Sequence, residues 1–129
     1  MKNKYNVLIV DDDEINNYLI TANLKKTGNC SAINCFTSAK KGLEYLQSLK
    51  NDNVRLPDII FLDMNMPAMT GIDFINSYIK IPLPTKLIFA ISNNFRPDEI
   101  NFLQEKGIKT WIKKPITREK LEEIFPQAT

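Results

Sequence analysis

The feature that most constrains the fold of this 129-residue chain is a run of four apolar residues, 59–62, that leads directly into Asp63. An apolar run without polar alternation predicts a strand that is buried on both faces of a sheet. Asp63 then falls at the carboxyl end of that strand, where open α/β sheets place their ligand sites. Pro67 and Gly71 predict a turn before the next helix. Taken alone, the stretch also fits an aspartate that merely ends a strand.

The rest of the chain alternates between short apolar runs and helical patterns. Strands are predicted at residues 6–10, 31–36, 59–62, 86–91 and 110–112. Helices are predicted at residues 14–27, 38–49, 71–78 and 97–106, and from a cap at Thr117 onward. This alternation predicts one doubly wound α/β domain over residues 1–129, with a five-stranded parallel sheet, right-handed crossovers and helices on both faces.

The helical patterns also predict which side chains face the core. The apolar stripe predicted for the first helix consists of Ile15, Tyr18, Leu19, Ile20 and Ala22. The other predicted core residues of helices are Leu43, Leu46, Leu49, Ile72, Phe74, Ile75, Ile79, Leu121, Ile124 and Phe125. A disulfide between Cys30 and Cys35 would distort the one short strand that holds both. We therefore expect buried free thiols and a reducing compartment.

Composition and charge exclude several classes of function. The formal net charge is +2, and the scattered basic residues are not interleaved with aromatics, so a nucleic-acid surface is not indicated. No apolar run approaches the roughly 20 residues of a membrane span, and the first residues do not form a secretory signal, so we expect a cytoplasmic protein. The chain has no histidine, which excludes His-based nucleophile systems and His-ligated metal sites. Any phosphohistidine must come from another molecule.

Four acidic residues, 11–14, follow the first predicted strand. They can form a solvated turn that caps the next helix, and we assign Asp13 and Glu14 to that role. Asp11 and Asp12 come directly after the strand, so their carboxylates can point back to the sheet edge. Carboxylates packed this closely repel one another unless a hard cation or solvent relieves the repulsion. We therefore interpret Asp11 and Asp12 as metal ligands.

The ends of four predicted strands bring acidic, hydroxyl and amino groups to one edge of the sheet. These groups belong to Asp11, Asp12, Asp63, Ser92 and Lys114. Carboxylates suit Mg²⁺, which prefers oxygen ligands. Asp63 would then act as a nucleophile toward phosphorus, while the metal and the ammonium neutralise charge on the phosphoryl oxygens and Ser92 donates to one of them. Each residue also fits an ordinary structural role, but their joint placement predicts a phosphoryl site.

This set of residues resembles the receiver domain of two-component response regulators, and the likeness covers the whole chain. It rests on Val10-Asp11-Asp12, the stretch 62–67 with Gly71, Ser92 after an apolar strand, and Lys114-Pro115. The resemblance implies a flavodoxin-like fold with strand order 2-1-3-4-5 and a phosphorelay signalling role instead of enzymatic turnover. The chain looks like a single-domain regulator similar to chemotaxis regulators. A receiver fragment of a larger regulator or hybrid kinase would look identical.

The resemblance implies which acidic residue is phosphorylated and which ones bind Mg²⁺. Asp63 is the implied phosphoacceptor, and the donor is the phosphohistidine of a histidine kinase or histidine phosphotransfer protein. Asp12, Asp63 and the backbone carbonyl of Asn65 are the implied ligands of Mg²⁺, and Asp11 assists through water.

The resemblance also implies how a signal leaves the site. Ser92 and Lys114 would sense the phosphoryl group, and the peptide bond between Lys114 and Pro115 would be cis. Trp111 stands where the family has its switch aromatic, usually Tyr or Phe. The output surface for a downstream protein would be formed by the fourth predicted helix, the fifth predicted strand and the fifth predicted helix. The alternative for Trp111 is a static packing residue at a strand end.

Two features depart from the family pattern. The residue after the switch hydroxyl is usually small, but here it is Asn93, which with Asn94 is expected to modulate the entrance for the phosphoryl group. The bulk of Trp111 is expected to restrict its inward swing. Both departures bear on rates and on switching amplitude.

Other functions for the same stretch remain to be weighed. A Mg²⁺-dependent phosphatase of the haloacid dehalogenase type also uses an Asp nucleophile after a buried strand, but it needs a second Asp two residues later. Asn65 occupies that place and cannot protonate a leaving group. A nucleotide or flavin binder of the same fold would need a glycine-rich loop, and the chain has four glycines in total. A degenerate receiver that acts only as a scaffold would lack acceptor or switch residues that are all present here.

Overall fold

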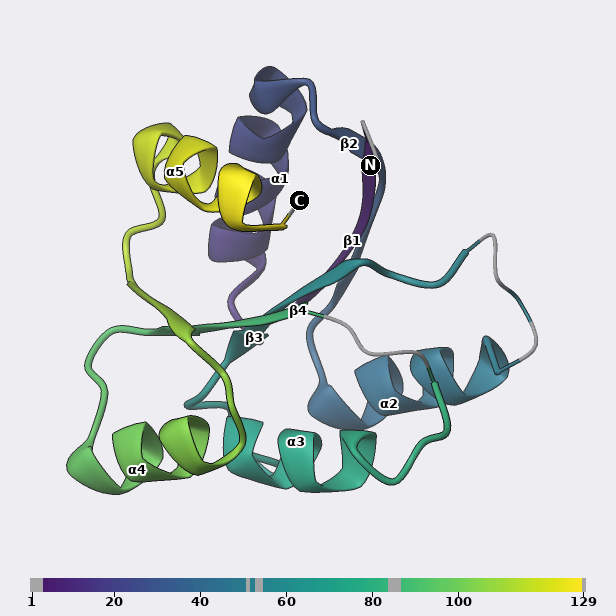
Figure 1. Cartoon of the computed structure of the whole chain (residues 1–129), viewed down its shortest axis with the longest axis vertical. Helices are drawn as coiled ribbons and strands as arrows, with labels where there is room; N and C mark the ends of the chain where they lie inside the picture. Colours follow the sequence, from purple (N-terminus) through teal and green to yellow (C-terminus); the bar gives the residue numbers. More distant parts are fainter. Residues whose placement is uncertain (1–3, 51, 53–54, 84–86, 129) are drawn as a thin grey trace.

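The computed structural model describes residues 4–50, 52, 55–83 and 87–128, with five strands and five helices alternating along them (Figure 1). The strands are β1 (Tyr5–Val10), β2 (Cys30–Phe36), β3 (Ile59–Asp63), β4 (Leu87–Ser92) and β5 (Thr110–Lys113). The helices are α1 (Glu14–Thr27), α2 (Ala39–Ser48), α3 (Gly71–Tyr78), α4 (Pro97–Glu105) and α5 (Arg118–Ala128). Among these helices, none has the length and apolar character needed to cross a membrane.

All strand pairs are parallel, and the strands lie in the order β2-β1-β3-β4-β5. Helices α1 and α5 cover one face of the sheet, and α2, α3 and α4 cover the other (Figure 1). This arrangement confirms the predicted flavodoxin-like α/β fold. The strand order reverses between β1 and β3, and ligand sites of such sheets lie at the carboxyl ends of the strands beside that point.

Two apolar cores fill the space between the sheet and its helices. Because successive side chains of a strand point to opposite faces, β1 contributes Leu8 and Val10 to the core under α2, α3 and α4. The same strand contributes Val7 and Ile9 to the core under α1 and α5. Every residue of β3 is buried, which confirms the prediction of a central strand that is covered on both sides.

Helix α1 turns a different face to the core than the sequence pattern predicts. Ile15, Tyr18 and Leu19 are 72%, 72% and 51% exposed, whereas Ile20 and Leu24 are fully buried. The predicted stripe was therefore wrong for three of its five residues. The reason is that the buried residues of α1 are Asn17, Ile20 and Leu24, which repeat every three or four positions, so the face that packs on the sheet and on α5 is turned away from the predicted stripe.

Two further expectations on burial, for Ile79 and for the cysteines, come out differently. Ile79 is 56% exposed, because α3 ends one residue before it. Cys35 is exposed and Cys30 half-buried, because β2 lies at the edge of the sheet; both thiols are free, as expected. The prediction that Phe125 belongs to the core, and the predicted first strand residue Lys86, lie outside what the structure describes.

Candidate functional site

The carboxyl edge of the sheet brings the predicted site residues together. Asp11 follows β1, Asp63 ends β3, Ser92 ends β4 and Lys114 follows β5. The parallel register pairs Asp63 with Ile91 and Ser92 with Lys113, so the ends of the three strands lie side by side. The sequence-based placement of these four residues on one edge is therefore confirmed.

Three carboxylates form a compact acidic cluster at this edge. Asp11, Asp12 and Asp63 each offer an oxygen, and these oxygens all lie within 4.8 Å of one another. Asp11 and Asp63 are buried, whereas Asp12 is exposed. Oxygen atoms so placed suit a hard divalent cation, which would relieve the repulsion between the three charges. The cluster can therefore bind a metal ion.

Lys114 places its amine against the acidic cluster. Its Nζ lies 2.9 Å from Asp11 Oδ2 and 3.6 Å from Asp63 Oδ2, and its side chain is 12% exposed. Burial acts to lower the pKa of Lys114, but the hydrogen bond to Asp11 and the nearby carboxylates outweigh it and raise the pKa. The amine is therefore held as an ammonium. Its peptide bond to Pro115 is cis, the geometry that the resemblance implies.

Asp11 is fixed by donors from the start of α1. Its Oδ1 accepts from the backbone N–H of Asp13 at 2.9 Å, and its Oδ2 accepts from Asn16 Nδ2 at 2.6 Å. Its backbone carbonyl accepts from Asn17 Nδ2 at 2.8 Å. The sequence analysis did not identify Asn16 and Asn17. Their spacing of five and six residues from Asp11 is a signal, because it places both amides in the first turn of a helix that starts beside this strand end. Asp13 itself caps α1, as predicted.

The carboxyl group of Asp63 lies in a site that disfavours its charge. Burial raises its pKa to about 7, and the charge of Asp11 adds to the rise. The backbone N–H of Asn65, which donates to Asp63 Oδ1 at 3.0 Å, and the ammonium of Lys114 act in the opposite direction. When no cation is bound, the site therefore favours the protonated form of Asp63 more than solvent would.

The hydroxyl of Ser92 is buried and fully engaged. It accepts from Asn65 Nδ2 at 2.6 Å and from the backbone N–H of Asn94 at 3.1 Å, and it donates to the carbonyl of Asn94 at 3.0 Å. Asn93 and Asn94 are exposed at the mouth of the site, and Asn94 contacts Ser92 through its backbone. The sequence analysis did not predict this side-chain contact between Asn65 and Ser92, because the two residues lie 27 positions apart in the chain.

A backbone hydrogen bond between Gly71 and Met64 closes the loop that follows Asp63. The N–H of Gly71 donates to the carbonyl of Met64 at 3.2 Å. A Cβ atom on Gly71 would stand 2.6 Å from Met64 Sδ and 2.7 Å from Met64 Cα, which no real side chain tolerates. Only glycine therefore lets the start of α3 pack against the residue next to Asp63.

Trp111 lies half-buried on β5, away from the acids. Its Nε1 donates to the carbonyl of Ile108 at 2.9 Å, so the indole N–H is satisfied. Its ring packs against Phe95 with 6.4 Å between centroids. Phe95 belongs to the loop after Ser92, and the sequence analysis did not single it out.

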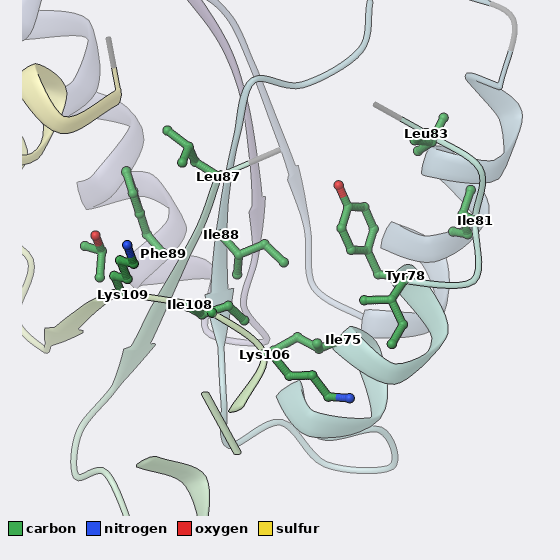
Figure 2. A pocket seen from close by; sticks show the side chains of 13 residues that line it. Ile75, Tyr78, Ile81, Leu83, Leu87, Ile88, Phe89, Lys106, Ile108 and Lys109 are labelled. Carbon is green, nitrogen blue, oxygen red and sulfur yellow. The ribbon is translucent and has the colours of Figure 1, made fainter. Parts of the chain in front are cut away.

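The structure has an apolar groove of about 420 Å³, which lies apart from the acidic cluster and Lys114 (Figure 2). Its walls come from the end of α3, the start of β4 and the segment between α4 and β5, including Tyr78, Ile88 and Ile108. These are the amino ends of the strands, opposite to the edge that carries the acids. None of the residues predicted for phosphoryl or metal chemistry lines it.

Comparison with known proteins decides the family. Residues 7–125 match the model of the response regulator receiver domain. The chain belongs to this family. It is 31% identical over 122 residues to the transcription factor SKN7 of Chaetomium thermophilum, covering 95% of the chain but 15% of that relative. The receiver domain therefore corresponds to a small part of the length of that protein.

Solved structures show the same fold. A two-component response regulator from Cytophaga hutchinsonii superposes with a TM-score of 0.84 at 25% identity, covering 95% of this chain and 94% of that one. A chain of the CheX–CheY–BeF3–Mg²⁺ complex from Borrelia burgdorferi gives a TM-score of 0.80 at 24% identity, covering 95% and 87%. The receiver domain described here is a phosphoacceptor signalling module rather than a catalytic domain. The family assignment replaces the phosphatase and flavin-binding alternatives.

Proposed function

We propose that Asp63 accepts a phosphoryl group from a phosphohistidine of a histidine kinase or histidine phosphotransfer protein, in a reaction that requires Mg²⁺. The observation that carries this proposal is the spacing of the charged groups. The carboxylates of Asp11, Asp12 and Asp63 converge within 4.8 Å, and Lys114 Nζ lies 3.6 Å from Asp63. Anionic cluster and ammonium together form a site that suits a metal-bound phosphoryl group.

The chemistry is a transfer from nitrogen to oxygen. A carboxylate oxygen of Asp63 forms a bond to phosphorus, the P–N bond breaks, and the leaving imidazole of the partner keeps the electron pair and takes up a proton. When bound, the metal neutralises charge on the transferring oxygens. Lys114 stabilises the same charge from the other side, and the buried edge of the sheet restricts the access of water.

The hydrogen bonds at the site distinguish the roles proposed for the acids. Both carboxylate oxygens of Asp11 already accept hydrogen bonds, which supports a role through water and not through a direct metal bond. Asp12 is exposed and stands open to solvent. We therefore assign direct contacts with Mg²⁺ to Asp12 and Asp63. The backbone carbonyl of Asn65 is proposed as a third ligand because the family resemblance implies it.

The test is intact-mass spectrometry after incubation with phosphoramidate and Mg²⁺. The wild-type chain is expected to gain one phosphoryl group, and Asp63→Asn is expected to gain none. Asp13→Asn is the matched control, because Asn also caps a helix and the same loop loses one negative charge. Equal modification of Asp63→Asn and wild type would refute the assignment of the acceptor.

We also propose that phosphorylation alters the surface formed by α4, β5 and α5, which then binds a downstream protein. A chain of contacts supports this proposal. Ser92 is bonded to Asn94 in the loop before α4, and the next residue, Phe95, packs on Trp111 of β5. A shift of Ser92 toward a phosphoryl oxygen thus reaches Trp111 through two neighbouring residues. We place this signalling in the cytoplasm, where free thiols such as those of this chain persist.

A further inference from the structure

Lys120, in the first turn of α5, bridges two backbone carbonyls of the segment before that helix. Its Nζ donates to the carbonyl of Lys113 at 2.9 Å and to that of Pro115 at 3.0 Å. Its backbone N–H donates to Thr117 Oγ1 at 3.2 Å, which fixes the start of the helix. The side chain therefore folds back along the chain onto residues five and seven positions earlier.

The ammonium of Lys120 lies in the first turn of α5, where a positive charge is unfavourable unless other contacts stabilise it. A positive charge in the first turn of a helix is opposed by the helix dipole, and ordering a lysine side chain costs conformational entropy. Charge-assisted hydrogen bonds to two carbonyls offset both terms. The two acceptors are therefore what holds the Lys120 ammonium where it is.

The two bridged carbonyls stand on either side of Lys114. The backbone N–H of Lys114 donates to the carbonyl of Ser92 at 2.9 Å, so the segment is anchored to β4 as well. The amine of Lys114 then reaches Asp11 at 2.9 Å. Lys120 thus fixes the backbone on both sides of the residue whose amine faces the acids.

We propose that Lys120 is a positioning residue for Lys114: by bridging the carbonyls of Lys113 and Pro115, it holds the Lys114 amine where a phosphoryl oxygen on Asp63 arrives. The consequence for phosphoryl transfer rests on the function proposed above. The effect of Lys120 on the position of the Lys114 amine does not depend on that function, because it is present in the unmodified protein. A misplacement of about 1 Å at a reacting group can cost on the order of 100-fold in rate, so a partial loosening of this segment is measurable.

The experiment compares Lys120→Met, which keeps the length of the side chain but cannot donate, with Lys120→Arg, which can. Arg118→Met is the matched control, because Arg118 lies in the same turn and pairs with Glu122 at 2.9 Å on the exposed face. The first measurement is trace acetylation of lysine amines in the unmodified protein, read for Lys114 by peptide mass spectrometry. The second is the rate of phosphorylation by phosphoramidate at saturating Mg²⁺.

In Lys120→Met, Lys114 is expected to be acetylated about three-fold faster or more, because its ion pair with Asp11 is looser. Phosphorylation is expected to slow about ten-fold, with the Mg²⁺ midpoint unchanged. Lys120→Arg and Arg118→Met should match the wild type in both measurements. Unchanged acetylation of Lys114 in Lys120→Met overturns the proposal, and so does an unchanged phosphorylation rate in a variant whose Lys114 has become reactive.

The two measurements separate this inference from the proposed function. If the wild-type chain takes up no phosphoryl group, the proposed function fails, while the acetylation rate still decides whether Lys120 positions Lys114. If Lys120→Met changes the Mg²⁺ midpoint as strongly as the rate, the variant has disturbed the acidic cluster as a whole, and a specific role toward Lys114 is refuted.

Discussion

Asn65 Nδ2 donates to Ser92 Oγ over 2.6 Å and so joins the loop after β3 to the end of β4. The hydroxyl of Ser92 itself donates a hydrogen bond to the carbonyl of Asn94. To donate to a phosphoryl oxygen, Ser92 has to give up the carbonyl of Asn94 as its acceptor, and we expect the accompanying shift to weaken the bond from Asn65. We therefore expect these hydrogen bonds to stabilise the unphosphorylated arrangement relative to the phosphorylated one.

Asn65→Ala should therefore favour the active arrangement. The variant keeps the backbone carbonyl proposed for Mg²⁺ but loses the side-chain bond to Ser92. A hydrogen bond of about 1 kcal/mol corresponds to an increase of about five-fold in affinity for beryllofluoride with Mg²⁺. The measurement is a binding titration, with Asn76→Ala, on the exposed face of α3, as the control. Weaker binding by Asn65→Ala would show that its amide serves the bound state instead.

Asp63 should make the metal-free protein less stable as pH rises. Its pKa is about 7 in the folded protein, against an ordinary value of 3.8. Between these values the folded state binds a proton that the unfolded chain does not, so stability present below pH 3.8 is lost as pH rises through about 7. The difference in free energy of unfolding between wild type and Asp63→Asn, from urea denaturation without Mg²⁺, should fall across this range. A flat difference would contradict the raised pKa.

Mg²⁺ should raise the melting temperature, because a ligand that binds only the native state stabilises it. Asp12→Ala is expected to abolish this rise at millimolar metal. The variant without metal should melt at or above the wild-type temperature, since Asp12 is exposed and its removal relieves repulsion from Asp11 and Asp63. Differential scanning calorimetry checks both statements. A rise in the Asp12→Ala variant equal to that of wild type would remove Asp12 from the metal site.

Substitutions on the two sides of α1 should differ strongly in cost. Leu19→Ala removes a side chain that is 51% exposed and should change the free energy of unfolding by about 0.5 kcal/mol or less. Leu24→Ala opens a cavity in a fully buried position and should cost about 2–5 kcal/mol. Urea denaturation gives both values. Similar costs for the two variants would mean that Leu19 is covered in solution.

The fold and the placement of the site could be predicted because both depend on local patterns. Apolar runs without alternation identify buried parallel strands, and residues at the ends of such strands must meet at one edge. This logic placed Asp63, Ser92 and Lys114 correctly before any tertiary contact was known. The bounds of β1, β2, β3 and β5 each differ from the prediction by a single residue, at Tyr5, Cys30, Asp63 and Lys113, because a strand begins and ends where its hydrogen bonds do and not where its apolar residues do.

What could not be predicted depends on contacts between distant segments. The exposed face of α1 differs from the predicted one because the helix packs on the sheet and on α5 through Asn17, Ile20 and Leu24. The apolar pattern of residues 14–27 does not predict that face. The bonds from Asn16 to Asp11 and from Asn65 to Ser92 form between side chains whose neighbours in space are unknown from sequence. The same holds for Lys120, whose charged side chain looks like part of a solvated helix face.

Trp111 should report the switch in its fluorescence. It is the only tryptophan of the chain, so its emission has a single source. Mg²⁺ with beryllofluoride is expected to change the emission, because movement of Ser92 displaces Phe95 from the indole ring. Ser92→Ala should reduce the change, since the variant cannot donate to the phosphoryl mimic.

The hydrogen bond from Trp111 Nε1 to the carbonyl of Ile108, 2.9 Å long, limits how far this change can go. Turning the ring inward breaks that bond, and an unpaired indole N–H costs about 1–3 kcal/mol when it is buried. The inward arrangement should therefore be only partly populated, and lifetimes should show two emitting states in the presence of the mimic. A single lifetime equal to that of the free protein, in a sample shown to bind beryllofluoride, would place Trp111 outside the switch.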